Sequence, residues 1–341
     1  MDVSNAFLNG DLSEDIYMLL LPGNRDLKGN KFLIMLFADD ILLTGNNFAF
    51  LDVAKHLQSS SFQIKNLSNL RYFLGLKIAR SKQDIHICQR KYMLELLEDF
   101  GFLACNSVAS PMDLKDKLSS DSGDLLIDVT HYRKLIGKLI YLSVTRPDIS
   151  YVVQKLNQFM SKPRSDHLTH AHRVLRYLKG VSTQGLFYPA DSSVRLSGYK
   201  NVDWAVCPDS RRSVIGFCIF IGNSLISCKS NKQQVMSRSN TESEYRAMAQ
   251  TSSELTWIAG FLRDLHIRFP MPITLYCDNQ SALHIDNNLV FHERTKHIEI
   301  NYHFVCGKLI SGFLKVLHVV SKDQVADVFT KPLVGKVSDV C

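Results

Sequence analysis

The sequence FLIMLFADDILLT, residues 32–44, places two adjacent carboxylates, Asp39 and Asp40, between two runs of large apolar residues. Such runs predict a buried β-hairpin with the two acids at its tip. Burying two neighbouring carboxylates costs several kcal/mol unless a partner neutralises them. A divalent metal ion is the usual partner, so this stretch predicts a metal site.

The composition limits the class of protein. The chain has 341 residues, 45% of them apolar, and 40 Lys and Arg against 33 Asp and Glu. This length accommodates two or three domains, and the positive excess favours an anionic partner such as nucleic acid. No run approaches the roughly 18 apolar residues of a membrane helix, and the N-terminus lacks a secretory signal pattern. We therefore expect a cytoplasmic or nuclear protein that is neither secreted nor bound to a membrane.

The acid pair alone also fits a solvated loop, but its neighbours add a family resemblance. The hairpin resembles the polymerase metal site of copia-type LTR retrotransposon reverse transcriptases. Residues 1–18, MDVSNAFLNGDLSEDIYM, resemble the first palm strand of that family, and most segments as far as residue 333 have a counterpart. The chain is thus identified as a member of the Pol polyprotein family, covering the C-terminal part of the RNA-dependent DNA polymerase and a ribonuclease H domain.

For the polymerase half, the resemblance implies that Asp2, Asp39 and Asp40 are the catalytic carboxylates. The fingers of the family have no counterpart, and only eight residues separate the Pro22-Gly23 turn from residue 32. Positioning supplies most of the catalysis in phosphoryl transfer, and these segments supply the positioning. We expect a truncated, degenerate, pseudogene-like copy without polymerase activity.

The expected fold class is multidomain, α+β and α/β. Residues 1–108 are expected to form a truncated palm, 109–128 a linker, 129–193 a helical thumb or connection, 194–331 a ribonuclease H-like α/β domain, and 332–341 a tail. Helical spacing of apolar residues predicts a helix over 90–100 that buries Met93, Leu94, Leu97 and Phe100. It also predicts three helices within 129–180, the first of which buries Ile140 among others. The third helix exposes Arg173, Arg176 and Lys179. This basic face fits an ordinary solvated surface, but the resemblance to the thumb and connection region implies that it grips phosphate.

The C-terminal segment shows the element order of the ribonuclease H fold. Strands are predicted over 196–206, 213–221 and 225–228, then a helix over 242–265, a strand over 273–277, a helix over 298–310, a strand over 314–320 and a last helix over 323–329. The motifs Thr241-Glu242-Ser243-Glu244-Tyr245, Tyr276-Cys277-Asp278-Asn279 and Gln324-Val325-Ala326-Asp327 resemble that domain in copia elements.

The same resemblance implies an active site that holds two Mg²⁺ or Mn²⁺ ions between carboxylates. Glu244, Asp278 and Asp327 are the implied ligands, with Glu242 as the alternative to Glu244. Where the family has an aspartate as first ligand, this chain has Asn201, which keeps an acceptor oxygen but lacks the charge. Asp203, on the same face of the strand, is the alternative first ligand, but it lies about 6 to 7 Å further along.

Two classes of function remain open from the sequence. The chain is either a ribonuclease that cleaves the RNA strand of an RNA–DNA hybrid, or a catalytically dead nucleic-acid-binding protein of the same fold, and Asn201 discriminates between them. A third alternative is an N-terminal part that does not fold stably. Other proteins of the same element, which the resemblance links to DNA integration, are further expected partners. The His clusters near residues 170 and 297 lack the matched spacing of zinc sites.

Overall fold

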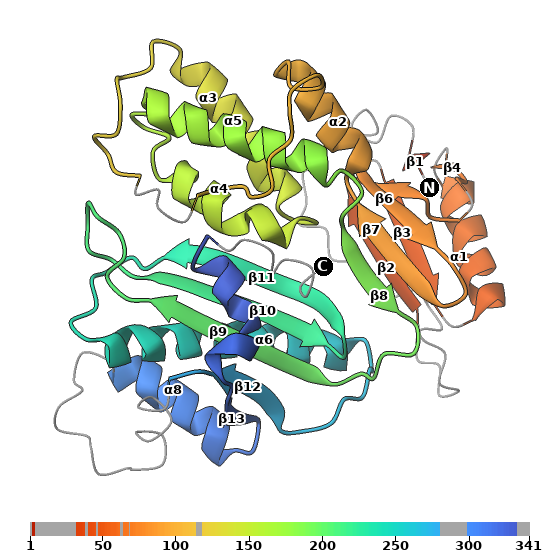
Figure 1. Cartoon of the computed structure of the whole chain (residues 1–341). Helices are drawn as coiled ribbons and strands as arrows, with labels where there is room; N and C mark the ends of the chain where they lie inside the picture. The colour runs from red at the N-terminus through yellow and green to blue at the C-terminus, as the bar shows by residue number, and fades with distance from the viewer. Residues whose placement is uncertain are drawn as a thin grey trace, which may run out of the picture. The chain divides into compact units, whose positions relative to one another are not determined.

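The structure is a computed structural model that describes residues 2–3, 32–37, 40–45, 47–61, 64–67, 69–113, 118–279 and 299–332 (Figure 1). By the contacts between Cα atoms, the chain divides into two units. One comprises Met1–Phe73 and Gly260–Arg268, and the other comprises Leu74–Ala259 and Phe269–Cys341. The five-part division expected from the sequence stays a prediction. Within the described ranges, none of the helices combines the length and the apolar character that crossing a bilayer requires.

The predicted hairpin is present in the first unit. Strand β2 (Phe32–Phe37) pairs antiparallel with β3 (Asp40–Gly45), and β1 (Asp2–Val3) lies on the other side of β3. The sheet has the order β2-β3-β1-β4, with β4 at Ile64–Lys65. Helix α1 (Phe48–Ser61) follows β3. The remaining described strand of this unit is β5, Tyr72–Phe73.

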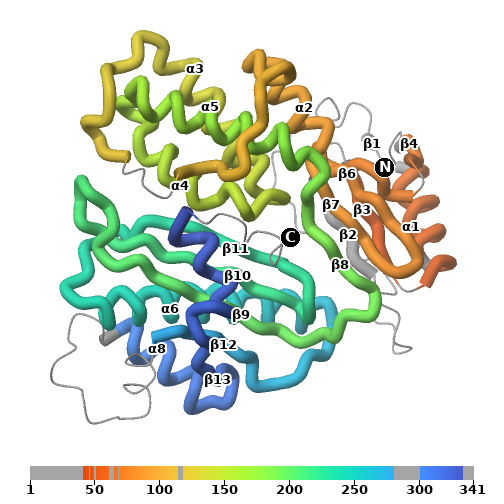
Figure 2. The backbone as a smooth tube through the Cα atoms, viewed as in Figure 1, coloured from red at the N-terminus to blue at the C-terminus, as the bar shows by residue number. Residues whose placement is uncertain are grey.

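The second unit begins with an antiparallel sheet that sequence reasoning only partly predicted. Strands β6 (Leu76–Arg80) and β7 (Asp84–Cys88) form a hairpin. Strand β8 (Leu186–Pro189) pairs with β7 in the register Ile87↔Leu186, although about a hundred residues separate them along the chain (Figure 2). No strand was predicted there, so the segment 129–193 is not wholly helical.

The helices of this unit share one apolar core, because their apolar residues recur at helical spacing. The helices are α2 (Arg90–Asp99), α3 (Val129–Leu142), α4 (Ser150–Asn157) and α5 (Ser165–Gly180). The core also includes Met112 and Leu118 from the expected linker. Two details of the predicted helix faces were wrong. In α2, Leu96 is buried and Leu94 is 39% exposed, and in α3, Ile140 is 40% exposed.

A buried ion pair forms at the short helix η2 (Pro147–Ile149), which precedes α4. The Arg146 guanidinium donates to both carboxylate oxygens of Asp148, at 2.9 and 2.5 Å, and to the carbonyl of Val181 at 3.0 Å. Such a bidentate arrangement satisfies both charges inside the protein.

The C-terminal sheet confirms the predicted ribonuclease H-like order. Its strands lie in the order β11-β10-β9-β12-β13, with the first three antiparallel and the last two parallel to β9. The bounds are β9 Leu196–Asp203, β10 Val214–Ile221, β11 Ser224–Lys232, β12 Ile273–Cys277 and β13 Leu314–His318.

Helices cover both faces of this sheet (Figure 1). Helix α6 (Asn240–Asp264) lies on one face, where a Cβ added at Gly198 would contact Leu255 and Thr251. Helix α8 (Glu299–Ile310) precedes β13. The last predicted helix is instead two short 3-10 turns, η4 (Ser321–Asp323) and η5 (Val325–Phe329). The turn η5 lies on the face opposite α6, as shown by the approach of Phe329 to Gly216 of β10.

Candidate functional site

Strand β9 directs successive side chains to opposite faces of the sheet. Lys200 and Val202 point toward α6, where Val202 packs against Ala247. Asn201 points toward η5. The pairs between β9 and β12 run from Ser197 to Tyr199, so the end of β9 lies beyond the paired segment. The predicted ribonuclease H residues therefore surround the end of β9, which pairs with β10 but extends beyond its pairing with β12, and they are divided between its two faces.

On the η5 face, the Asn201 side chain is a hydrogen-bond donor. Its Nδ2 donates to Asp327 Oδ1 at 2.5 Å and to Thr330 Oγ1 at 2.7 Å. Lys331 Nζ donates to the same Asp327 oxygen at 3.1 Å. Asn201 is 2% exposed, so these contacts form inside the protein. The structure thus brings Asn201 and Asp327 together, but as an amide bonded to a carboxylate rather than as two metal ligands.

On the α6 face, Lys200 Nζ donates to Glu244 Oε2. The Lys200 side chain is 0% exposed and that of Glu244 is 4% exposed. The alternative acid, Glu242, has other partners. It accepts hydrogen bonds from the backbone of Arg238 at 2.8 Å and from the Arg246 guanidinium at 2.9 Å. Of the two glutamates, Glu244 is therefore the one directed at β9.

The two remaining acids differ in their surroundings. Asp278 directly follows β12, and its Oδ1 is buried without a hydrogen-bond partner among the residues that the structure describes. Asp203 is half-buried at the end of β9. Burial raises the pKa of Asp203, and Asp327 adds to this, while the ammonium groups of Lys331 and Lys155 oppose it. A raised pKa means that the surroundings disfavour the charged form.

These residues do not fit the two divalent cations that the fold implies. Hard cations require oxygen ligands that are not already neutralised. Glu244 faces an ammonium, and Asp327 faces an amide NH₂ and a second ammonium. Among the described residues, Asp278 Oδ1 is the one buried carboxylate oxygen of these three acids that has no hydrogen-bond partner. In the same part, no three His, Cys, Asp or Glu side chains form a group that could hold a metal ion.

The predicted polymerase acids are only partly described. Asp2 of β1 lies directly opposite Asp40 of β3 in the antiparallel register. Directly opposed residues in such a ladder have Cα atoms about 4.5 to 5.5 Å apart. Asp39 lies outside the described residues. The backbone therefore brings two of the three predicted carboxylate positions together.

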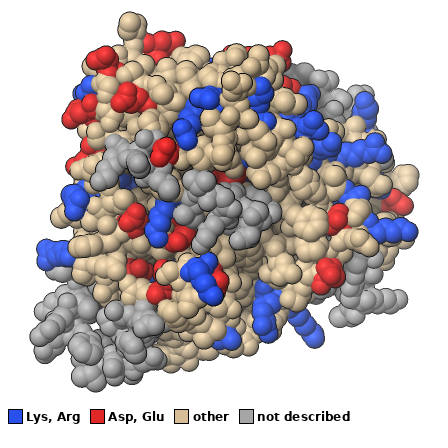
Figure 3. Space-filling model, in the orientation of Figure 1, with Lys and Arg blue, Asp and Glu red and all other residues tan. Residues whose placement is uncertain are grey.

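The basic residues predicted to grip phosphate on α5 have internal partners. Arg173 donates to the carbonyl of Ser110, Arg176 to that of Asn106, and Lys179 to that of Cys105. They hold the segment that follows α2 against α5, which accounts for these basic residues without nucleic acid. Figure 3 shows acidic side chains gathered at the upper left of the drawn face and Lys and Arg side chains at the upper right, with both kinds interspersed over its lower half.

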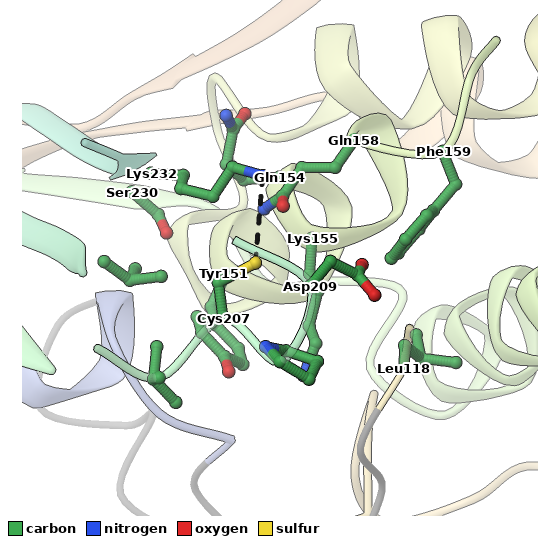
Figure 4. Close-up of a pocket in the computed structure, with 13 residues that line it drawn as sticks. Leu118, Tyr151, Gln154, Lys155, Gln158, Phe159, Cys207, Asp209, Ser230 and Lys232 are labelled. Carbon is green, nitrogen blue, oxygen red and sulfur yellow. Dashed lines mark hydrogen bonds between the residues drawn. The ribbon is translucent and has the colours of Figure 1, made fainter. Parts of the chain in front are cut away.

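A small cavity lies between α4, the segment after β9 and β11 (Figure 4). Cys207 lines it, with Lys232 Nζ at 3.9 Å from its sulfur and the Ser210 hydroxyl at 3.2 Å. Burial raises the pKa of this thiol, but hydrogen bonds from Ser210 and the Lys232 charge outweigh it, so the pKa is lowered overall. The space for water is about 20 Å³, which holds one or two water molecules.

Sequence reasoning missed Lys200. The sequence contained a signal, because Lys200 shares its strand face with Gly198 and Val202, and a lysine on the buried face of a strand requires an acidic partner.

Comparisons with known proteins identify the family. Residues 24–114 match the family model described as reverse transcriptase (RNA-dependent DNA polymerase). The chain is 38% identical to the retrovirus-related Pol polyprotein from transposon RE1 of Arabidopsis thaliana, over 98% of this chain and 26% of that protein. It is 40% identical to the uncharacterized mitochondrial protein AtMg00810 of the same plant, over 66% of this chain and 93% of that protein.

Among solved structures, the foamy viral protease-reverse transcriptase in complex with double-stranded DNA covers 84% of this chain and 46% of its own, with 14% identity and a TM-score of 0.46. The chain spans about a quarter of the RE1 polyprotein. From the sequence matches, this chain belongs to the family of copia-type retrotransposon Pol polyproteins.

Proposed function

We propose that this chain binds nucleic acid, an RNA–DNA hybrid in the first instance, through its ribonuclease H-like domain and does not hydrolyse it. The observation that carries this proposal is the Asn201 amide on Asp327. Phosphodiester cleavage in this fold requires carboxylates that hold two metal ions. Here one carboxylate position is an amide, and the partner acid is already hydrogen-bonded.

The Trp204 surface supports binding. It consists of Trp204, Val235, Met236 and Arg238, which lie where β9 ends and α6 begins. Trp204 is 47% exposed and Met236 58% exposed, and the indole Nε1 donates to the carbonyl of Ser237 at 3.2 Å. An exposed aromatic ring beside an arginine is suited to stack on a base and to contact a phosphate.

The family and the charge agree with this proposal. Proteins that bind nucleic acid through phosphate contacts carry a net positive charge, and this chain has a formal charge of +7. The basic side chains of α5 contribute less than the sequence predicted, because they bond to the segment 105–110. The Trp204 surface is therefore the proposed contact region, and other proteins of the element are secondary partners.

The test uses the full chain and a labelled RNA–DNA hybrid. Binding is followed by fluorescence anisotropy at several salt concentrations, and cleavage is followed on denaturing gels in Mg²⁺, Mn²⁺ or EDTA. We expect saturable binding that weakens with salt and an intact RNA strand in all three conditions.

Asp278→Asn is the control variant for cleavage. Cleavage by the native chain that disappears in Asp278→Asn would show that the chain is a ribonuclease. Cleavage that persists in the variant would identify a contaminating nuclease. Absence of saturable binding at low salt would contradict the proposal itself.

A further inference from the structure

Lys200 is a charged side chain enclosed by the protein. It lies in the middle of the C-terminal sheet, on strand β9, with a side chain that is 0% exposed. A buried ammonium costs several kcal/mol in desolvation unless a well-placed anion compensates it. Glu244, itself 4% exposed, supplies that anion. The two charges therefore depend on each other.

The position of this pair follows from the fold. Lys200 shares the α6 face of β9 with Gly198 and Val202, since residues two apart on a strand point the same way. Glu244 precedes Ala247 by three residues on α6, and Ala247 packs on Val202. Residues three apart on a helix lie on the same side. Strand and helix periodicity thus direct Lys200 and Glu244 toward one another.

Asn201, the next residue of β9, engages an acid on the η5 face of the sheet. Asn201 donates to Asp327, while Gln324 Nε2 donates to the carbonyl of Lys200 at 3.0 Å. Two consecutive residues of β9 thereby engage Glu244 and Asp327, two of the three acids that the family resemblance assigns to the metal site.

The charges at this end of the sheet argue against added cations. The three acids Glu244, Asp278 and Asp327 carry −3, and the ammonium groups of Lys200 and Lys331 carry +2, which leaves −1. Two divalent cations would bring the sum to +3. With four carboxylates and no lysine, the same two cations would bring it to zero. Lys200 supplies one of the three unit charges by which these two arrangements differ, and it thereby reduces the attraction for a divalent ion.

We propose that the Lys200 ammonium replaces a divalent cation in this domain. It neutralises Glu244 permanently, so that the domain folds and keeps its acidic centre together without Mg²⁺ or Mn²⁺. The inference concerns the site of the proposed function, but its test contains no nucleic acid, so either can fail while the other stands.

Tryptophan fluorescence of the full chain gives the readout. The chain has two tryptophans, Trp204 and Trp257, and both lie in the segment 194–331. Thermal unfolding is compared in EDTA and in about 10 mM Mg²⁺ or Mn²⁺. A metal site with a Kd of about 0.1 mM would raise Tm by roughly 5 °C or more under these conditions. We expect no shift for the native chain, and a rise of several degrees would overturn the proposal.

Substitutions at Lys200 and Glu244 distinguish the effect of the Lys200 charge from the effect of its side-chain packing. Lys200→Met leaves Glu244 buried without a partner, and we expect Tm to fall on the order of 10 °C. The double variant Lys200→Met/Glu244→Gln removes both charges, and we expect it to recover most of that loss. Lys331→Met, which removes the more exposed ammonium on Asp327, is the matched control and should shift Tm by a few degrees at most.

The variants can also contradict the proposal. If Lys200→Met is no less stable than Lys331→Met, the buried charge is not required. If Lys200→Met fails to fold, the double variant decides, because the proposal requires it to fold. A double variant as unstable as the single one would show that Lys200 acts through its packing, not its charge.

Discussion

Asn201 and Asp327 form a short hydrogen bond, 2.5 Å from Nδ2 to Oδ1, that joins strand β9 to the turn η5. A carboxylate at position 201 could not donate this bond at neutral pH. The same amide also donates to Thr330. The side chain that the family resemblance places at a metal ligand's position therefore links two elements of the fold.

We predict that Asn201→Asp lowers stability in EDTA by about 2 kcal/mol, because it removes two buried donors and places a second carboxylate beside Asp327. The urea midpoint followed by tryptophan fluorescence measures this. Asn223→Asp, in the exposed turn between β10 and β11, is the control and should change stability little. Equal midpoints for the two variants would show that the Asn201 bonds do not stabilise the native state.

Trp204→Ala should weaken hybrid binding about tenfold, since stacking on an exposed ring contributes about 1 to 3 kcal/mol per base. Trp257, which is 66% exposed on α6, provides the matched control. Fluorescence anisotropy at a single low salt concentration compares the two variants with the native chain. A larger loss for Trp257→Ala than for Trp204→Ala would place the contact region elsewhere.

The sequence predicted the C-terminal fold well because its elements are local patterns. Strands β10 and β12 are mostly apolar runs, and α6 is a long helical segment. Strand β8 escaped prediction because LFYP is short, ends in proline and is stabilised by pairing with β7, about a hundred residues earlier. The sequence did not identify the last element as a 3-10 turn, because five residues carry too little periodicity to distinguish the two helix types.

The candidate site was predictable as a set of residues but not as a set of contacts. The motifs around Glu244, Asp278 and Asp327 identified the acids, and the absence of an aspartate at position 201 was visible in the sequence. The ion pair between Lys200 and Glu244 depends on how closely β9 approaches α6, which a linear pattern does not give. The preference for Glu244 over Glu242 likewise required the direction of each side chain on the first turn of α6.

Gly216→Ala should destabilise the domain by about 1 to 3 kcal/mol, because an added Cβ would lie 2.6 Å from the Phe329 Cβ and 3.0 Å from the Ala326 carbonyl. Neither atom is the end of a flexible side chain, so η5 would have to move. Gly137→Ala in α3 is the matched control, since nothing lies within 4 Å of its added Cβ and alanine favours a helix. We expect its urea midpoint to stay unchanged or rise, and a similar loss for both variants would contradict the close approach of η5.

His167 should make the stability of the second unit depend on pH. Its ring is 0% exposed, stacks on Phe159 at 3.9 Å between centroids and accepts from the backbone of Arg164. Burial lowers the pKa of this imidazole, only partly opposed by its hydrogen bond to the Ser119 carbonyl. Below about pH 6.5 the unfolded chain therefore binds more protons than the native one.

The stability that neutral His167 contributes is consequently complete above about pH 6.5 and is lost as the pH falls from there toward its lower native pKa. We expect His167→Gln to be less stable at pH 8 and to lose less further stability between pH 8 and pH 5 than the native chain. Circular dichroism melts across this range measure both effects, and Thr169→Gln, at an exposed position without a titratable group on the same helix, is the control that should keep the native slope. Because partial burial also lowers the pKa of the half-buried His172, some pH dependence should remain in His167→Gln. An unchanged slope in that variant would mean that His167 binds protons equally in the native and unfolded states, which would contradict a lowered native pKa.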